Sequence, residues 1–526
     1  MKKLYKYLLM ALLLFGILSA ALVYATRDNR VIIENYTSIN RKPKIRPDYC
    51  DTVIPPNIAP LNFLLQEKGL HYCVKISSRA GQPIEVFSKT GKIIIPEKPW
   101  HKLLNQNKGQ ELYFDVFVKT ENNQWHRYQT ITNKIAAEPI DGFLVYRRMR
   151  PLYSKWKEMG IYQRNLHSFD ESVVLNNKSF KLGCVHCHTF LANNTDRMLM
   201  HVRSFNGPSM LLIENGKASN IDSRTSFSTA PMGYTGWHPS GKLIVFTVYK
   251  VFQFFHTTGL QVRDVYELDS ALGYYLFDSK IVKTSPQLSK KDRLETYPNW
   301  TPDGRYLYFC SAPMLWPQEQ RKIPEQYNQV KYDLHRISYD LETDTWGKLE
   351  TVLSAEQTGL SIIQPRISPD GRFILFCMCQ YSCFPAFQPS SDLYLMDLNT
   401  GRYERLACNS DQSESWHCWS SNNRWIVFSS KRGTGLFSKG YFSYIDQNGK
   451  AHKPFLLPQK DPTFYDSFTY LYQMPELIKT PIPVTGERLA KLIRSPLQLN
   501  TQIPVTAASP EAGPAYRAEP WQSGLE

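Results

Sequence analysis

One short motif in this chain places cysteine and histidine at a spacing that can do chemistry. It reads Cys184-Val185-His186-Cys187-His188, with two thiols three positions apart and a histidine directly after the second. On one helical turn, two such thiols can each add across a haem vinyl group, and the adjacent imidazole can bind the iron. Random placement of the 10 cysteines and 12 histidines would give this pattern about 0.004 times. The motif therefore predicts one covalent haem c, attached to Cys184 and Cys187 and ligated by His188.

Three other roles for the same cysteines stay open: a zinc site, a redox-active pair and an ordinary disulfide. A zinc site needs further ligands, and the nearest other cysteines are more than 100 residues away in sequence. A thioredoxin-like pair opens a helix after a strand in a small α/β domain, which the flanking sequence does not resemble. Haem attachment is the interpretation that the spacing favours.

The sixth ligand of the iron decides between electron transfer and catalysis. His201 is the first candidate, and Met198 and Met200 are the alternatives, because all three follow His188 within 13 residues. A histidine would hold the redox potential low, whereas a methionine would raise it. Both methionines can also be core residues, and an open sixth position would permit catalysis. The more distant competitors are His167, His238 and His256.

The first 25 residues predict export from the cytoplasm. Three lysines in the first six positions precede an apolar run over residues 8–23, which is the pattern of a signal peptide. Cleavage after Ala25 and retention of residues 7–25 as an anchor in the inner membrane both fit this pattern. We therefore expect the body of the protein in the periplasm or cell envelope. Ten cysteines suit that oxidising compartment, although sequence cannot pair the eight outside the motif.

The formal net charge of +15 favours anionic partners. Lys and Arg are spread along the chain without a concentrated basic tract or a nucleic-acid-binding signature, so we expect no nucleic acid. An acidic redox protein is the partner that this charge and the haem motif suggest together. Association with a membrane through the N-terminus is the other expected contact.

Beyond residue 230 a pattern recurs four times, at spacings of 63, 67 and 52 residues. Each copy has an extended stretch, a tight turn and an apolar run of strand length, the composition of one blade of a β-propeller. The turn uses Pro-Asp-Gly or substitutes, since Pro sets the first turn position and Gly or Asn tolerates the left-handed one. The copies begin at Trp237, Trp300, Ile367 and Trp419.

These repeats resemble the TolB-like propeller repeat with its Ser/Thr-Pro-Asp-Gly-Arg turn, across about residues 205–475. The second and third copies match best, whereas Ser240 replaces Asp in the first and Asn422-Asn423 replaces Asp-Gly in the fourth. More closely, the chain resembles exported bacterial proteins that place a C-x-x-C-H segment before such a propeller and have no established activity. The residues that carry this resemblance lie at 419–425, 453–459 and 474–476.

The expected fold is mainly β. We predict a signal peptide or anchor at 1–25, a linker at 26–47, a β-sandwich-like domain at 48–141, and a short helical haem c segment at 142–204. A five- or six-bladed propeller at 205–475 and a flexible tail at 476–526 complete the chain. A fifth blade could form if residues 210–213 paired with the strand around 468–471. The six-bladed count comes from the family resemblance.

The expected function is that of an exported mono-haem c-type cytochrome that transfers electrons, with the propeller as a docking platform. The alternatives are a binding or sensing module for a protein or glycan, with haem in a regulatory or structural role, and a haem enzyme with an open sixth site. No G-x-S-x-G nucleophile motif occurs. Cys377, Cys379 and Cys383 form a weaker candidate for a soft-metal site, in competition with a disulfide or buried thiols.

Overall fold

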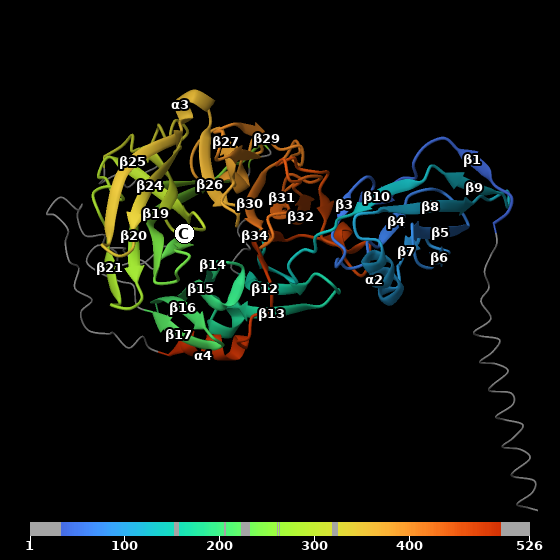
Figure 1. Cartoon of the computed structure of the whole chain (residues 1–526), viewed down its shortest axis with the longest axis horizontal. Coiled ribbons are helices and arrows are strands. Elements are labelled where there is room, and N and C mark those ends of the chain that lie inside the picture. Colours follow the sequence, from blue (N-terminus) through green and yellow to red (C-terminus); the bar gives the residue numbers. More distant parts are fainter. Residues whose placement is uncertain are drawn as a thin grey trace, which may run out of the picture.

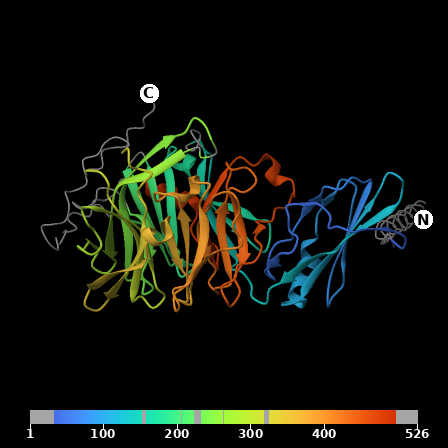
Figure 2. The ribbon, with the colours of Figure 1, turned by 90° about the horizontal axis from the view of Figure 1, so that it is seen from above.

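The computed structural model describes residues 33–151, 157–204, 207–221, 232–259, 261, 263–317 and 324–495. The predicted signal segment at 1–25 lies outside these residues, as do the last 31 positions of the chain. A smaller N-terminal unit lies beside a larger ring of sheets (Figure 1), and the view from above shows the same two units next to each other (Figure 2). Within the described part, no helix has the length and apolar character needed to span a membrane.

The N-terminal unit consists of a seven-stranded mixed sheet, a three-stranded sheet and one helix. The seven strands are β1 (Thr37–Ile39), β3 (Val53–Ile54), β5 (His71–Ser78), β6 (Ile84–Ser88), β8 (Glu111–Lys119), β9 (Trp125–Tyr128) and β10 (Ile131–Ile135). The smaller sheet holds β2 (Ile45–Arg46), β4 (Phe63–Leu65) and β7 (Lys92–Ile93), and the helix is α2 (Glu97–Gln106). Phe63 and Phe114 pack edge to face between the two sheets, with ring centroids 6.2 Å apart.

The expected linker at 26–47 is wrong over its described part. Residues 37–39 pair in parallel with residues 126–128, and residues 45–46 pair with residues 64–65. These strands belong to the N-terminal unit because their backbone groups find partners in its two sheets.

Six four-stranded antiparallel sheets form the larger unit. From the centre outward, the first sheet contains β34 (Leu471–Ile478), β11 (Phe143–Met149), β12 (Met159–Asn165) and β13 (Glu171–Asn176). The second contains β14 (Cys184–Leu191), β15 (Asn194–Ser204), β16 (Gly207–Glu214) and β17 (Lys217–Ile221). The third contains β18 (Gly233–Trp237), β19 (Leu243–Phe255), β20 (Arg263–Leu276) and β21 (Ile281–Lys283).

The other three sheets continue the same order around the ring. The fourth contains β22 (Arg293–Trp300), β23 (Tyr306–Pro313), β24 (Asp333–Asp340) and β25 (Thr345–Leu353). The fifth contains β26 (Ser361–Ile367), β27 (Phe373–Cys379), β28 (Asp392–Asp397) and β29 (Tyr403–Arg405), and the sixth contains β30 (Glu414–Trp419), β31 (Trp425–Ser430), β32 (Lys439–Tyr444) and β33 (Phe455–Leu456). Short helices lie at η2 (Asn177–Phe180), α3 (Ala355–Thr358), η3 (Pro385–Phe387) and η4 (Phe464–Ser467).

The six innermost strands contact one another around a closed ring, in the order β34, β14, β18, β22, β26 and β30 (Figure 1). The sheets are therefore arranged as the blades of a propeller. The first sheet closes the ring, because its innermost strand comes from residues 471–478 and its other three from residues 143–176. Because the ring is closed, the innermost edge of each sheet faces the neighbouring blades and is not open to pairing with another chain.

Two expectations about this region are wrong. The described residues of this range, 142–151 and 157–204, lie mostly in strands β11 to β15 rather than in a helical segment, because they supply three strands of the first sheet and two of the second. Residues 210–213 lie in β16, which pairs with β15 and β17, whereas β34 pairs with β11. The propeller thus begins at about residue 143, well before the predicted boundary at 205.

The four repeats are confirmed as parts of blades. Each copy spans the end of an innermost strand, a tight turn and the second strand of the same sheet. Gly241, Gly304 and Gly371 have φ values of 71° to 74°, and Asn423 has a φ of 62°. The left-handed position that the turn requires is therefore filled by the residues predicted from the sequence.

The predicted tail at 476–526 is ordered in its first part. Helix α4 (Gly486–Arg494) begins at Thr485, whose side chain accepts a hydrogen bond from the backbone N–H of Arg488. Leu489, Ala490 and Ile493 are buried, and the helix packs against β13 and β17. An amphipathic helix of this kind is stabilised by burial of its apolar face.

The N-terminal unit docks on the sixth sheet. The indole N–H of Trp425 donates to the carbonyl of Glu138, and the hydroxyl of Ser421 donates to Asp141 at 2.6 Å. Lys453 in the sixth sheet forms an ion pair with Asp48. One hydrophobic core runs from the N-terminal sheets into this blade, so the two units are joined by packing as well as by hydrogen bonds.

Candidate functional site

Every innermost strand of the propeller breaks its register near its middle. In five strands the first residue that the pairing skips has a positive φ of 40° to 57°. These residues are Tyr234, Tyr297, Gln364, Trp416 and Met474. Side chains other than glycine adopt this conformation at a cost of about 1–2 kcal/mol each. In β14 the corresponding break skips His186 and Cys187, which belong to the C-x-x-C-H motif.

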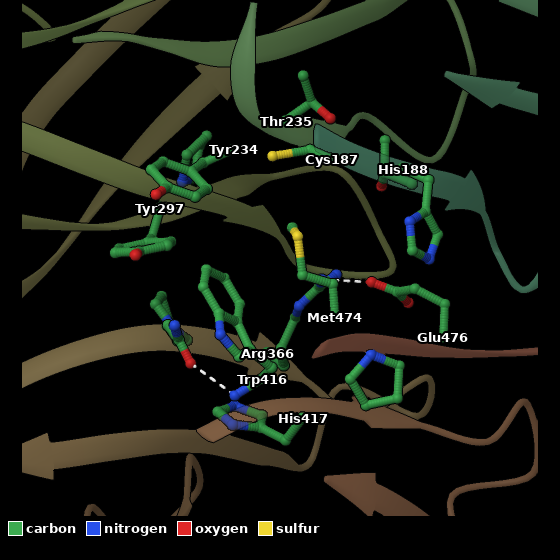
Figure 3. A pocket seen from close by; sticks show the side chains of 15 residues that line it. Cys187, His188, Tyr234, Thr235, Tyr297, Arg366, Trp416, His417, Met474 and Glu476 are labelled. Atoms are coloured by element: carbon green, nitrogen blue, oxygen red, sulfur yellow. Dashed lines mark hydrogen bonds and ion pairs between the residues drawn. The ribbon is translucent and has the colours of Figure 1, made fainter. Parts of the chain in front are cut away.

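These bulges surround the central channel, which we define as the space enclosed by the six innermost strands. All six strands contribute residues to a small cavity at its centre (Figure 3). Tyr234 packs against two further rings, with centroid distances of 4.3 Å to Tyr297 and 6.1 Å to Trp416, and these two rings are 6.3 Å apart. We call these three residues the aromatic plug, since they fill the channel between its two ends.

A larger cavity lies at each end of the channel. The first, which we call the upper mouth, has a volume of about 270 Å³ and includes Cys184 and His186 near the beginning of β14. The second has a volume of about 280 Å³ and is lined by the ends of the innermost strands and the turns that follow them. The C-x-x-C-H motif therefore runs from the upper mouth down to the aromatic plug.

Both cysteines of the motif are buried thiols. Arg203 and Tyr249 lie within electrostatic range of both. Burial raises the pKa of Cys187 to about 11, so this thiol is neutral at physiological pH. Its sulfur points towards Tyr234, whereas the ring of His188 points the other way, towards the first sheet (Figure 3).

His188 is buried, and neither of its ring nitrogens has a hydrogen-bond partner. Burial and the charge of Arg147 lower its pKa to about 3, which keeps the imidazole neutral. The carbonyls of Val145 and Met474 are close to the ring, but neither meets hydrogen-bond geometry. A buried imidazole with both nitrogens unpartnered is costly, and His101 and His201 share this state with His188.

His417 provides an internal comparison. It follows the bulge of β30 as His188 follows that of β14, and it too is buried and turned towards the preceding sheet. Its Nε2 lies 3.1 Å from the carbonyl oxygen of Leu375 in β27. The position thus accommodates an ordinary structural histidine, and His188 differs in lacking the bond that satisfies His417.

The three candidates for a sixth ligand lie on β15 and are buried. Met200 stands directly opposite His188 in the pairing of β14 with β15. His201 points to the other face of this sheet, where its ring lies 5.3 Å from that of His186, and Met198 is a core residue opposite Phe190. The structure therefore does not bring His201 to the imidazole of His188.

The remaining histidines named from the sequence have other partners. His167 stacks on His101 with ring centroids 3.6 Å apart, and His238 lies 3.1 Å from the carbonyl of Gly304. His256 pairs with Asp264 at 2.8 Å. These contacts account for all three without a ligand.

The soft-metal candidate at Cys377, Cys379 and Cys383 fails. All three are buried thiols in the core around the channel. In the part of the chain that the structure describes, no three histidine, cysteine or carboxylate side chains converge in a way that could hold a metal ion.

The donor set of the motif matches a c-type haem in residue type and in the unpartnered His188, but Cys187 and His188 point in opposite directions here (Figure 3), so haem binding would require one of these side chains to reorient. Two thiols at the correct spacing and a buried neutral imidazole with an available nitrogen are what covalent attachment and proximal ligation require. The upper mouth adjoins them with the rings of Tyr249 and Phe252 in its wall. We expected the motif on a helical turn, whereas its backbone is an extended strand with a bulge.

Sequence reasoning missed the residues that complete the site. The aromatic plug and His417 come from three different sheets and show no common motif. Two arginines of the upper mouth, Arg147 and Arg263, lie 116 positions apart in the chain. A bulge recurs in each innermost strand and could have located the plug. A bulge is recognised only from the pairing of its strand with a neighbour, which the sequence alone does not give.

Comparisons with known proteins support no named family. No family model matches the sequence. An uncharacterized protein of Agrobacterium fabrum is 26% identical over 161 residues, covering 26% of this chain and 50% of that protein. The chain thus spans about half the length of this curated relative.

Several solved structures resemble the chain in shape at low identity. Oligogalacturonate lyase of Vibrio parahaemolyticus has a TM-score of 0.33 at 12% identity, covering 73% of this chain and 100% of that chain. A chain of the nidogen/laminin complex has a TM-score of 0.36 at 9% identity, covering 65% of this chain and 100% of that chain. Scores this low carry no argument about function, and the fold assignment rests on the sheet topology.

Proposed function

We propose that this chain is an exported c-type cytochrome that carries one haem in the channel of its propeller and transfers electrons in the cell envelope. The observation that carries the proposal is the unpartnered imidazole of His188 beside two buried thiols of a C-x-x-C-H motif. The contrast with the satisfied His417 supports it, because the fold by itself does not require an unpaired nitrogen at this position.

Each residue would have a defined task. Cys184 and Cys187 would hold the haem through thioether bonds, and His188 would ligate the iron. When bound, the haem supplies a one-electron couple between ferric and ferrous iron. The aromatic plug lies in the channel beside Cys187 and His188.

Electron transfer is favoured over catalysis because the cysteine–histidine pair within the motif, His186 Nδ1 with the sulfur of Cys187 at 2.7 Å, holds a buried thiol whose pKa is raised to about 11. The channel centre offers Arg366 and Glu476, but these form an ion pair with each other at 2.5 Å. The upper mouth contains no carboxylate among its described lining residues. His186 lines this cavity, but its Nδ1 contacts the sulfur of Cys187, whereas a docking surface for a redox partner needs no general acid or base.

The test is to produce the protein by export in a host that attaches haem, and to record oxidised and reduced spectra together with a pyridine haemochrome assay. We expect one c-type haem per chain, with the mass of the chain raised by that of haem. Cys184→Ala with Cys187→Ala should abolish attachment, whereas Cys50→Ala with Cys73→Ala, two buried thiols of the N-terminal unit, should retain it. A folded wild-type protein without covalent haem would refute the proposal.

A further inference from the structure

Among the residues that the structure describes, the upper mouth gathers positive charge without a carboxylate in its lining. Its lining includes Arg147, Arg203 and Arg263. A fourth cation, Lys431, contacts the ring of Phe387, which is also a lining residue. Arg147 and Arg263 are only 6% and 5% exposed, and Lys431 is 5% exposed. Among the ion pairs of the described residues, none involves any of these four cations.

Their existing contacts are with neutral groups. Arg147 donates to the side-chain oxygen of Gln473 at 2.5 Å, but its Nε has no partner. Arg203 donates to the hydroxyl of Tyr249 at 3.3 Å. These bonds satisfy single N–H groups and leave the charges uncompensated.

The other two cations share one aromatic ring. The guanidinium of Arg263 lies 3.8 Å from the centroid of Phe387, and the ammonium of Lys431 lies 5.0 Å from it. Cation–π contacts offset part of the desolvation cost and cannot neutralise a charge. The neutral thiol of Cys187 adds no negative charge to the region.

The cations also disfavour one another. Burial and the neighbouring Arg147 lower the pKa of Arg263 to about 9, and burial and Arg263 lower the pKa of Lys431 to about 7. Buried charges in folded proteins are ordinarily paired, because an unpaired one costs several kcal/mol. A cluster built in this way is expected to hold an anion.

We propose that the upper mouth is a binding site for carboxylate groups, which pair with Arg147, Arg203 and Arg263 while the rings of Phe252, Phe384 and Phe387 contact the apolar part of the same ligand. The volume of about 270 Å³ suits a small dicarboxylate or the two propionates of a haem. Arginine matches carboxylates through paired hydrogen bonds.

The experiment measures thermal unfolding of two forms of the full chain, the haem-loaded protein and the Cys184→Ala, Cys187→Ala variant, with increasing succinate at ionic strength held constant by sodium chloride. A ligand bound only by the folded state should raise the Tm with its concentration, by about 2 °C or more at saturation. A rise in both forms assigns the site to a diffusible dicarboxylate. A rise in the haem-free form alone assigns it to the haem propionates.

Two variants decide whether the response comes from this cavity. Arg263→Gln removes a buried cation and should abolish the response, while the ligand-free Tm stays the same or rises because an unpaired charge is gone. Arg305→Gln, at an exposed position in a repeat turn, should leave the response intact. No rise in either form, or a rise that persists in Arg263→Gln and Arg147→Gln, would overturn the proposal.

This inference does not depend on the haem proposal, and the two fail separately. A protein that carries no haem but binds succinate through Arg263 keeps the carboxylate site and loses the cytochrome assignment. A haem protein that shows no response to succinate in either form keeps the cytochrome assignment and loses the site.

Discussion

His188 and His417 occupy the same position after the bulge of two innermost strands, and only His417 is hydrogen-bonded, through Leu375. The two residues are therefore a matched pair in which burial and backbone are alike and the bonding differs. A metal ion bound to His188 would remove this difference in bonding, since coordination would satisfy one nitrogen of its ring.

This pair gives the first prediction. His417→Gln should lower the Tm and leave the haem spectrum unchanged, because it disturbs a bond within the fold by about 1 kcal/mol. His188→Gln should change the spectrum of the haem-loaded protein and cost little stability in the haem-free form. Absorption spectra and thermal unfolding of both variants provide the check, and equal effects on the spectrum would contradict it.

The ion pair of Arg366 with Glu476 gives the second prediction. It joins β26 to β34, the strand that closes the ring, and the carboxylate is 9% exposed while the guanidinium is 33% exposed. Glu476→Gln should destabilise the fold by about 1–2 kcal/mol, less than for a fully buried pair because Arg366 keeps some solvent.

A double-mutant cycle with Arg366→Gln in urea unfolding should show coupling between the two substitutions. The exposed pair of Arg305 with Asp303 is the control, and Arg305→Gln should have almost no effect. Additive losses from Glu476→Gln and Arg366→Gln would show that the pair does not stabilise the closure.

Glu267 gives a pH-dependent prediction. Its buried carboxyl accepts hydrogen bonds from Ser270, Thr296 and Tyr332, and burial raises its pKa from 4.5 to about 7. The unfolded chain therefore loses this proton at a lower pH than the folded protein. Its contribution to stability is present below about pH 4.5 and is lost as the pH rises through 7.

The expected loss is on the order of 3 kcal/mol across this range relative to Glu267→Gln, which keeps a neutral side chain. Urea unfolding of the wild type and the variant at about pH 5 and pH 8 measures it. The difference between the two proteins should change with pH, and identical pH profiles would rule out the assigned role of Glu267.

Two repeat turns give the fourth prediction. Gly304 and Gly371 share a φ of 74°, so alanine at either position incurs about 1 kcal/mol of backbone strain. A Cβ on Gly304 would also lie 2.5 Å from Nε2 of His238, whereas one on Gly371 would lie 3.5 Å from its nearest neighbour. Gly304→Ala should therefore lower the Tm more than Gly371→Ala, and the reverse order would contradict this account.

Local sequence patterns predicted four blades and missed two. The turn after β14 uses Ala192 and Asn193 in place of Pro-Asp-Gly, although both residues have positive φ. The first sheet combines residues 143–176 with residues 471–478, and no local pattern can show that such distant segments pair. The expected helical segment at 142–204 rested on local helical patterns, but the strand ladders of two blades determine its conformation.

From the sequence, only the part of the candidate site that is contiguous along the chain could be predicted. Cys184, Cys187 and His188 were identified because they form one motif. Arg263 and Lys431 are 168 positions apart and come together through the ring, so their unbalanced charge is a property of the fold alone. The same holds for His201, whose side chain is directed away from His188 by the alternation of β15.

If the proposed haem is attached, the closure of the ring by β34 sets an order of events for maturation. The cysteines of β14 are buried between the first and third sheets, and β34 is the last strand of the propeller to be synthesised. An attachment enzyme would have to reach these thiols before residues 471–478 dock. The proposed haem attachment would then have to precede closure of the propeller. A chain whose ring closed first would keep its thiols buried and would not receive haem.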